Sequence, residues 1–495
     1  MSYLELLRLA MPETIIVITA LIVLVVDLTT TRGVGLRTRM IIGTMFTCVG
    51  CGIAIAWMLI MHDTANAFGG MLVADPLTQF VKIALLVLTA FTALLSIDND
   101  FTTHAGEYLA LILLAAVGMM FLVSAEDILM IFISLELTSL SLYILAAFNK
   151  RDIKSAESAL KYFLFGGMSA AFTLFGLSLL YGVSGATNLR DIANAIAGIG
   201  LDPLLIVAIV MIVIGFGFKV AAVPFHLWAP DAYQGAPIPS AAFIASGSKV
   251  ASFFIFAKVM MLGFAGAEGS GAWRDFAAGW VPVIAVVAGL SMVLGNLVAL
   301  AQSSVRRLLA YSAIAHAGYM LLAVLTHNGE SLASLIYYTV TYGLTTVGAF
   351  GVVAVVEQQT GGETFSNFAG LSRRAPLISL CMMIFMLSLA GIPPLAGFFG
   401  KFYIFAEAVK TGAPHLGMLW LVILAIAMSA VSLYYYLQVL KQIWVVEPSG
   451  ESSRLAVSRA MEVALVILAL AVLVFGCVPD WLLGPIQHAV ASAGF

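Results

Sequence analysis

The sequence has very little charge for its length, and this shortage sets its class. Only 10% of its 495 residues are Asp, Glu, Lys or Arg, whereas 62% are hydrophobic. A soluble globule of this size could not cover its surface with so few polar groups. We therefore predict a polytopic membrane protein. The formal net charge of -3 includes no basic patch for a nucleic-acid partner, so neither DNA nor RNA is expected.

Sequence motifs for cofactors and metals are also missing. The chain has no G-x-G-x-x-G after a strand, no Walker sequence and no H-E-x-x-H. Cys48 and Cys51 form a C-x-x-C inside an apolar stretch, and Cys381 and Cys477 lie far from it. A zinc or iron–sulfur site would need more ligands close together. We expect inert thiols, with no metal and no cofactor on this chain.

The sequence is instead rich in long hydrophobic runs. At about 20 apolar residues per span, they predict about fourteen transmembrane helices. The runs show no period-two alternation, which excludes a membrane barrel and favours an all-α bundle. The predicted spans lie near residues 8–30, 38–60, 76–97, 106–124, 126–148, 155–182, 203–228, 239–265, 280–302, 307–326, 331–358, 376–411, 415–446 and 460–483.

Lys and Arg residues are unevenly divided between the two sides of this predicted bundle. The first run has no small-residue cleavage signal after it, so it is expected to remain as the first span. Loops on one side then hold thirteen positive residues, against four on the other. Positive loops face the cytoplasm, so both termini are predicted to be periplasmic. The thirteen are Arg32, Arg37, Arg39, Lys150, Arg151, Lys154, Arg306, Arg307, Arg373, Arg374, Lys441, Arg454 and Arg459.

Four ionisable side chains interrupt the apolar stretches near their middles. They are Glu136, Lys219, Lys249 and Lys401. Each costs roughly 2.5–3.5 kcal/mol at the centre of a membrane helix, so such groups are kept mainly where they carry ions or protons. Lys249 lies about ten residues, or roughly 15 Å, from the start of its span, too deep for its ammonium to reach the interface easily. We therefore predict a proton or cation path.

The span that contains Glu136 has a polar face. Ser139 and Tyr143 follow Glu136 at i+3 and i+7, so the three side chains share one side of the helix. Such a face could hold water, and burial and nearby charges can tune a carboxylate as a proton site. A structural ion pair is the alternative.

Prolines break two of the predicted spans beside lysines. Lys219 lies five residues before Pro224, while Pro393 and Pro394 precede Lys401. A helix broken at membrane depth is buried in protein or lines a wet cavity, as in transporters. The two breaks are predicted to run in opposite directions, as an inverted repeat requires, although the lysine precedes the proline in one and follows it in the other.

Three further lysines each allow a structural and a functional interpretation. Lys82 and Lys258 lie nearer predicted helix ends, which favours ammonium groups that extend to the interface. Lys161 follows Glu157 by four residues, so it forms either a structural pair or part of the relay.

Two histidines are further candidates for the relay. His226 follows the Pro224 break, and His316 lies among small residues. Neutral imidazole both donates and accepts, so either could pass protons or be a structural, hydrogen-bonded side chain.

Four motifs then carry a family resemblance. FISLELTSLSLYILAAF, KVAAVPFHLWAPDAYQGAP, YSAIAHAGY and SLAGIPPLAGFFGKFYIF occur in this order. They resemble the antiporter-like membrane subunits of respiratory complex I, the proton-pumping NADH:quinone oxidoreductase, over nearly the whole chain. The resemblance implies two inverted five-helix repeats with a broken helix in each. The expected division is residues 1–105 for three N-terminal helices, 106–265 and 266–446 for the repeats, and 447–495 for a last helix and tail.

The resemblance also implies roles for the four buried charges. The family's key glutamate falls on Glu136, the lysine of the first broken helix on Lys219, that of the next helix on Lys249, and that of the second broken helix on Lys401. Sister subunits usually have glutamate at the last position. The lysine, and the end of the chain soon after its last span, favour one branch of the family. The three N-terminal helices suggest a bacterial enzyme in the inner membrane.

The expected function is proton translocation driven by quinone reduction in other subunits. Glu136 would bias the charge of Lys219, Lys249 would pass the proton on, and Lys401 would exchange it with the outer side. Flavin, iron–sulfur clusters and quinone are expected in partner subunits, and sister antiporter-like subunits and lipid as neighbours. The alternatives are a subunit of a multisubunit sodium/proton antiporter and a non-conducting scaffold.

Overall fold

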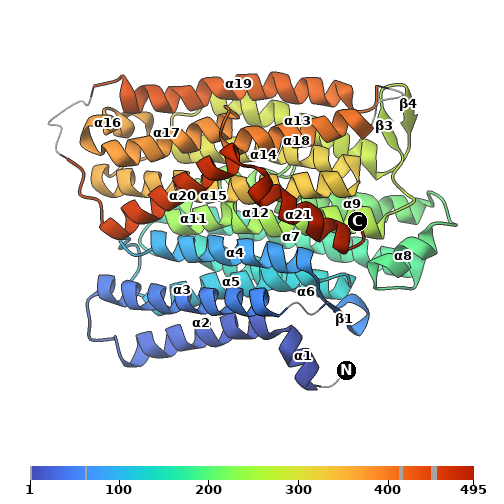
Figure 1. Ribbon diagram of the computed structural model, residues 1–495, viewed down its shortest axis with the longest axis horizontal. Helices are drawn as coiled ribbons and strands as arrows, with labels where there is room; N and C mark the ends of the chain where they lie inside the picture. Colours follow the sequence, from blue (N-terminus) through green and yellow to red (C-terminus); the bar gives the residue numbers. More distant parts are fainter. Residues whose placement is uncertain (1–2, 62–63, 412–415, 448–453) are drawn as a thin grey trace.

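The chain folds into a bundle whose helices run along its long axis (Figure 1). The computed structural model describes residues 3–61, 64–411, 416–447 and 454–495. In these ranges, twelve helices are long and apolar enough to span a membrane, and two shorter apolar helices, α9 (Pro203–Lys219) and α17 (Pro376–Ala390), end where the breaks were predicted. The prediction of an all-α membrane protein with about fourteen spans and two broken helices is confirmed.

Four helices form the N-terminal part, which lies at one edge of the bundle (Figure 1). They are α1 (Tyr3–Leu9), α2 (Met11–Thr29), α3 (Leu36–Ile60) and α4 (Pro76–Leu95), and strands β1 (Ala65–Ala67) and β2 (Leu72–Ala74) pair between the last two.

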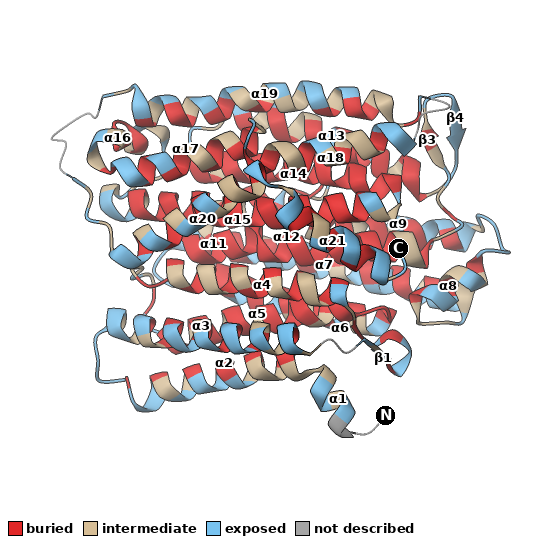
Figure 2. Ribbon diagram, in the orientation of Figure 1, coloured by how far each residue is buried: buried red, intermediate tan, exposed pale blue. Residues whose placement is uncertain are grey.

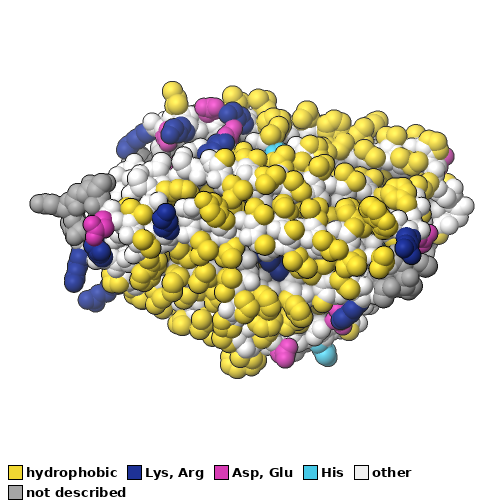
Figure 3. Space-filling view, turned by 90° about the horizontal axis from the view of Figure 1, so that it is seen from above, with side chains coloured by type: hydrophobic (Ala, Val, Ile, Leu, Met, Phe, Trp, Pro, Cys, Tyr) yellow, Lys and Arg dark blue, Asp and Glu magenta, His cyan; other side chains and the backbone are white. Residues whose placement is uncertain are grey.

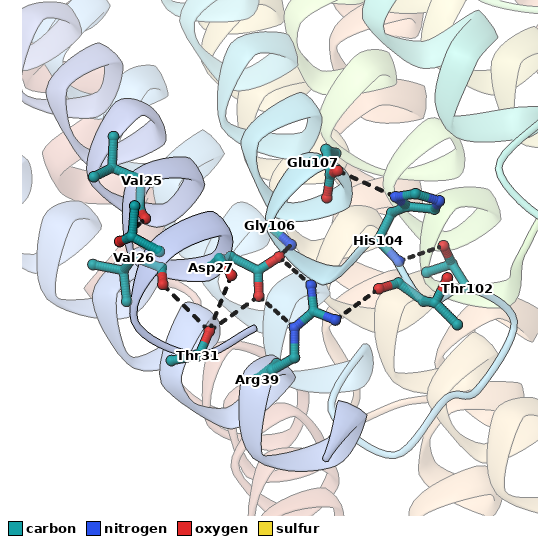
Figure 4. Close-up of polar contacts among 11 residues, drawn as sticks. Val25, Val26, Asp27, Thr31, Arg39, Thr102, His104, Gly106 and Glu107 are labelled. Atoms are coloured by element: carbon teal, nitrogen blue, oxygen red, sulfur yellow. Dashed lines mark hydrogen bonds and ion pairs between the residues drawn. The ribbon is translucent and has the colours of Figure 1, made fainter. Parts of the chain in front are cut away.

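A polar cluster joins this part to the rest of the chain (Figure 4). Arg39 on α3 donates from Nε and Nη2 to the two oxygens of Asp27 on α2, at 2.7 and 2.6 Å. The N–H of Gly106, in the first turn of α5 (Ala105–Ser124), donates to the same carboxylate at 2.9 Å. A bidentate Arg–carboxylate pair has a fixed geometry, so α2, α3 and α5 are held in register at this point.

Two sets of helices then follow each other with the same order of elements. The first consists of α5, α6 (Ile128–Ala146), α7 (Ile153–Ser184), the broken pair α9 and α10 (Trp228–Gly235), and the pair α11 (Ile238–Ala245) and α12 (Gly247–Lys258). The second consists of α13 (Trp280–Leu300), α14 (Val305–Thr326), α15 (Gly329–Thr360), the broken pair α17 and α18 (Ala396–Thr411), and α19 (Leu419–Trp444).

Corresponding loops in the two sets make the same backbone pairing. Asp127, before α6, forms an antiparallel bridge with Asn188, after α7. Ser304, before α14, forms one with Thr364, after α15. This shared feature supports two related five-helix units, whose predicted residue boundaries stay a prediction.

Several short elements were not predicted. The segment 184–202, expected to be a loop, contains α8 (Leu189–Ile196), which Asn188 caps through the N–H of Arg190 and which buries Leu189, Ile192 and Ile196. The last predicted span ends earlier, because α20 (Arg459–Cys477) stops and α21 (Asp480–Ser492) packs against α4 and α15. The expected tail is thus a packed helix. The others are β3 (Ser270–Ala272), β4 (Asp275–Ala277), α16 (Leu371–Arg374), and short helical turns at Phe68–Gly70, Val259–Gly263 and Phe365–Phe368.

Burial divides the bundle into a centre and a periphery. Helices α12, α14 and α15 are almost entirely buried, whereas α2, α3 and α19 expose much of their apolar surface (Figure 2). Apolar side chains cover the middle of the face in Figure 3, and charged ones gather mainly at its two ends. The loop after α2 and α16 lie at one end of the bundle, and α8 and both hairpins at the other (Figure 1). This arrangement agrees with the predicted alternation of loops.

Candidate functional site

The first polar cluster lies where α9 ends against α6. Lys219 is the last residue of α9, and its Nζ donates to Ser139 Oγ at 2.6 Å. The same Nζ lies 3.7 Å from Glu136 Oε1. The Lys219 side chain is 9% exposed and that of Glu136 27% exposed. The polar face predicted on α6 therefore receives the lysine of the first broken helix.

The break beside this cluster is held by residues from elsewhere in the chain. The N–H of Val223 donates to Ser291 Oγ on α13 at 2.9 Å. Trp228 Nε1, at the start of α10, donates to the carbonyl of Phe218 at 3.0 Å. Buried backbone groups need such partners, so the broken segment has a defined shape.

The second cluster begins at Lys249, next to a helix interruption that was not predicted. Ser246 separates α11 from α12, so Lys249 is the third residue of α12. The Ser–Gly–Ser run at residues 246–248 could have predicted this kink, since Gly/Ser pairs are frequent at kinks. Lys249 Nζ donates to the carbonyl of Ala313 on α14 and lies 5.7 Å from the ring centroid of Tyr342.

His316, on α14, is hydrogen-bonded to tyrosines from two other helices, α15 and α19. Its Nδ1 lies 2.6 Å from Tyr338 Oη and its Nε2 lies 3.1 Å from Tyr436 Oη. The ring is 1% exposed and within electrostatic range of both Lys249 and Lys401. Because neutral imidazole accepts at one nitrogen and donates at the other, His316 can join the two tyrosine hydroxyls in one hydrogen-bonded chain.

Lys401 lies on α18 and faces the end of α17 across the second break. Its Nζ donates to the carbonyls of Leu389 and Ala390, at 3.0 and 3.2 Å, and to Ser429 Oγ on α19 at 2.9 Å. Among the residues that the structure describes, no carboxylate lies within 4.0 Å of this ammonium. Lys401 also lines a largely apolar cavity of about 670 Å³ between α18 and α19.

Lys161 and His226 make no hydrogen bond with Lys219, Lys249 or Lys401 in the described part of the chain. Lys161 is 40% exposed and pairs with Glu157 at 2.7 Å, as its spacing predicted, and with Asp231 at 2.8 Å, which was not foreseen. His226 is buried in the first break, and no hydrogen bond recorded for the described residues joins it to Lys219. A role for Lys161 or His226 in proton transfer stays a prediction.

Two predictions about lysines were wrong. Lys82 and Lys258 do not extend to the interface, because both are 2% exposed. Lys82 Nζ lies 2.6 Å from Glu13 Oε1 on α2, and Lys258 Nζ lies 3.1 Å from Glu126 Oε1. A carboxylate from a distant part of the chain replaces the water that such a lysine would otherwise have to reach.

Sequence reasoning also missed the partners of the candidate residues. Tyr338, Tyr436, Ser429 and Asp231 come from elements far away in the chain, so no spacing pattern could identify them. The described residues contain no group of three or more His, Cys, Asp or Glu side chains placed to hold a metal ion.

Comparisons with known proteins agree with this geometry. The family described as "NADH:quinone oxidoreductase/Mrp antiporter, TM" matches residues 125–429. The chain is 52% identical to NADH-quinone oxidoreductase subunit N 2 of Acidobacterium capsulatum over 491 residues, which are 97% of this chain and 98% of the relative. The chain belongs to the subunit N family of NADH:quinone oxidoreductase.

Structural comparison agrees with membership in the subunit N family. A chain of respiratory complex I from Thermus thermophilus is 33% identical and superposes with a TM-score of 0.77, over 96% of this chain and 98% of that one. A chain of the Mrp complex from Dietzia sp. is only 18% identical but superposes with a TM-score of 0.82, over 98% and 97%, so it shares the fold. The resemblance stated from the motifs is confirmed, and this subunit N chain is an antiporter-like membrane subunit of a multisubunit enzyme.

Proposed function

We propose that this chain translocates protons within a NADH:quinone oxidoreductase and that Glu136, Lys219, Lys249 and Lys401 carry the proton. The observation that supports this most is the environment of Lys249 and Lys401. Both ammonium groups are buried and donate to carbonyl or hydroxyl oxygens. A buried charge that lacks an ionic partner is costly, and such groups are kept in membranes mainly where they carry ions or protons.

The two clusters divide the transfer into steps. Glu136 and Ser139 stabilise the charged form of Lys219, and a change in that pair alters the field at Lys249, because charges in a low-dielectric interior are weakly screened. Helices α9 and α12, which carry these two lysines, pack against each other. Lys249 then exchanges its proton with Lys401 through His316, and Lys401 releases it. Lys161 and His226 remain candidates for secondary roles.

The proposed function also implies a membrane and a set of partner subunits for this chain. We place it in a bacterial cytoplasmic membrane with both termini periplasmic, because thirteen positive loop residues against four favour that direction. Flavin, iron–sulfur clusters and quinone would reside in partner subunits, and sister antiporter-like subunits would flank this chain. A sodium/proton antiporter assembly is the second candidate, favoured only by the shared fold. Copurification of flavin and iron–sulfur subunits separates the two.

The relay is tested by Lys219→Ala in the intact complex. Loss of the ammonium group removes one proton carrier, so we expect NADH-to-quinone turnover and proton uptake in sealed vesicles to fall together by about tenfold or more. Lys410→Ala is the control, since Lys410 is exposed and pairs with Glu407 at the surface, at 2.5 Å. A scaffold role predicts a smaller amount of assembled complex with normal turnover per complex, and normal proton uptake by Lys219→Ala would contradict the relay.

A further inference from the structure

Four lysines of the membrane helices lie over an aromatic ring, and two of them use a ring of their own helix. Lys219 Nζ lies 5.7 Å from the ring centroid of Phe218, and Lys258 Nζ lies 5.9 Å from that of Phe254. Each of these two ammonium groups also has a carboxylate, at 3.7 and 3.1 Å. The carboxylate is therefore their main counter-group, and the neighbouring ring follows from the local sequence.

The other two lysines, Lys249 and Lys401, lie over tyrosine rings that come from different helices. Tyr342 on α15 lies 5.7 Å from Lys249 Nζ, and Tyr319 on α14 lies 5.1 Å from Lys401 Nζ. Within the described ranges of the chain, neither ammonium has a carboxylate within 4.0 Å. The face of an aromatic ring is electron-rich and attracts a cation, most strongly when the pair is buried. Tertiary packing therefore supplies a tyrosine ring where the first two lysines have a carboxylate.

The Tyr319 ring is held in place from helix α13. Its hydroxyl accepts from Asn296 Nδ2 at 2.9 Å, and both side chains are fully buried. The same Nδ2 donates to the carbonyl of Met292 at 2.7 Å, and Asn296 Oδ1 accepts from the hydroxyl of Tyr435 on α19 at 3.0 Å. Contacts at both its nitrogen and its oxygen fix the orientation of the amide. Through this amide, the position of the Tyr319 hydroxyl is fixed as well.

Two glycines let α13 and α14 approach closely enough for this hydrogen bond. A Cβ added at Gly295 would lie 2.5 Å from a backbone nitrogen of α14, and one at Gly318 would lie 2.7 Å from a carbonyl oxygen of α13. Small residues allow such close contact between the backbones of membrane helices. Asn296 and Tyr319 each directly follow one of these glycines in the sequence. The two polar side chains are therefore placed where the helices cross most closely.

We propose that the face of the Tyr319 ring is the counter-group of the Lys401 ammonium and that Asn296 is the positioning residue that holds this ring. The assignment rests on the proposed function, because it explains how Lys401 holds a proton without a carboxylate. Release of a proton beside a carboxylate would leave a buried, unpaired negative charge, which is costly. Release beside Tyr319 leaves a neutral amine and a neutral ring. Lys401 can therefore gain and lose its proton without a counter-ion that must move.

Fluorination of the ring tests the counter-group, because fluorine withdraws electron density from the ring face with little change of shape. Phenylalanine analogues with one, two or three ring fluorines would be incorporated at position 319 of the intact complex, with Tyr319→Phe as the reference. Proton uptake in sealed vesicles, per assembled complex, should fall stepwise, by about tenfold at three fluorines.

The same series of analogues at Phe350 is the matched control. Phe350 is fully buried, and none of the four ammonium groups that lie over rings in the described part of the chain lies over this one. Uptake should stay constant along this control series. Constant uptake along the series at position 319, or an equal fall in both series, would overturn the assignment of Tyr319.

Asn296→Leu tests the positioning role in two backgrounds. It removes the hydrogen bond to Tyr319 at similar volume, so uptake should slow by about fivefold. In the Tyr319→Phe background, where that bond is already absent, Asn296→Leu should add no further loss. Tyr435→Phe removes the contact on the other side of the amide and should keep uptake nearly normal. Equal losses in both backgrounds would show that Asn296 does not act through Tyr319.

Lys219→Ala distinguishes a failure of this assignment from a failure of the relay. If Lys219→Ala abolishes pumping while fluorination at position 319 has no effect, the counter-group is wrong and the relay stands. If Lys219→Ala pumps normally, the proposed function itself fails.

Discussion

At the scale of single residues, the buried lysines fall into two groups according to whether their partner is charged or neutral. Lys82 and Lys258 face carboxylates at 2.6 and 3.1 Å, whereas Lys249 and Lys401 donate to neutral oxygens. A carboxylate offsets the charge of the first two ammonium groups, whereas the other two have neutral hydrogen-bond partners. Lys219 is an intermediate case, because its ammonium group lies 3.7 Å from Glu136. Position along the span could not separate these lysines, because the distinguishing partner comes from another helix.

The buried pair Glu13–Lys82 gives a prediction about stability. Lys82→Met leaves Glu13 buried without a counter-charge, which costs about 3–5 kcal/mol in comparable cases. We therefore expect a lower melting temperature for the purified complex but unchanged turnover per assembled complex. Adding Glu13→Leu should restore most of the lost stability. A loss of turnover at normal stability would show instead that Lys82 belongs to the proton path.

At the scale of elements, prolines predicted the breaks of α9 and α17 because they remove helical hydrogen bonds locally. The fourteen spans could also be predicted from a local signal, since each is an apolar run of the sequence. The interruption at Ser246, helix α8 and the packing of α21 were missed. They depend on capping, on a small-residue kink and on neighbours that the local sequence does not specify. The four charged residues could be singled out from the sequence, but the contacts of His316 with Tyr338 and Tyr436 depend on the packing of α14, α15 and α19.

Helix α10 depends on an arginine from the second half of the chain. Arg306, in the first turn of α14, donates from Nε to the carbonyl of Tyr233 at 2.9 Å and from Nη2 to that of Ala236. It also pairs with Glu357 at 3.3 Å. Arg306 on α14 therefore supplies hydrogen-bond donors to the C-terminal carbonyls of α10.

Arg306→Ala should loosen α10 and leave buried carbonyls unpaired. Hydrogen bonds to charged groups contribute about 1.5–3 kcal/mol each, so we expect lower thermal stability and slower turnover, with Arg306→Lys intermediate. Arg373→Ala is the control, because Arg373 is exposed and its pair with Glu447 is at the surface. Equal behaviour of Arg306→Ala and Arg373→Ala in melting and turnover assays would refute this role for Arg306.

At the scale of the whole molecule, the proposed relay crosses from the first five-helix unit to the second. Glu136 and Lys219 belong to α6 and α9, Lys249 to α12, and His316 and Lys401 to α14 and α18. Contacts such as Lys249 to Ala313 and Val223 to Ser291 join the two units at the level of these residues. The N-terminal helices lie at one edge and contribute none of the four charges (Figure 1). A single path that uses both units makes them act together.

The central claim is that Lys219 and Lys401 serve one path in series, and a double-mutant comparison tests it most directly. Proton uptake and NADH-to-quinone turnover would be measured for Lys219→Ala, Lys401→Ala and the double variant in intact, fully assembled complexes. Residues that act as a unit are strongly non-additive, so the double variant should lose no more than the worse single variant. Losses that multiply in the double variant, or single variants that still pump normally, would contradict a common path.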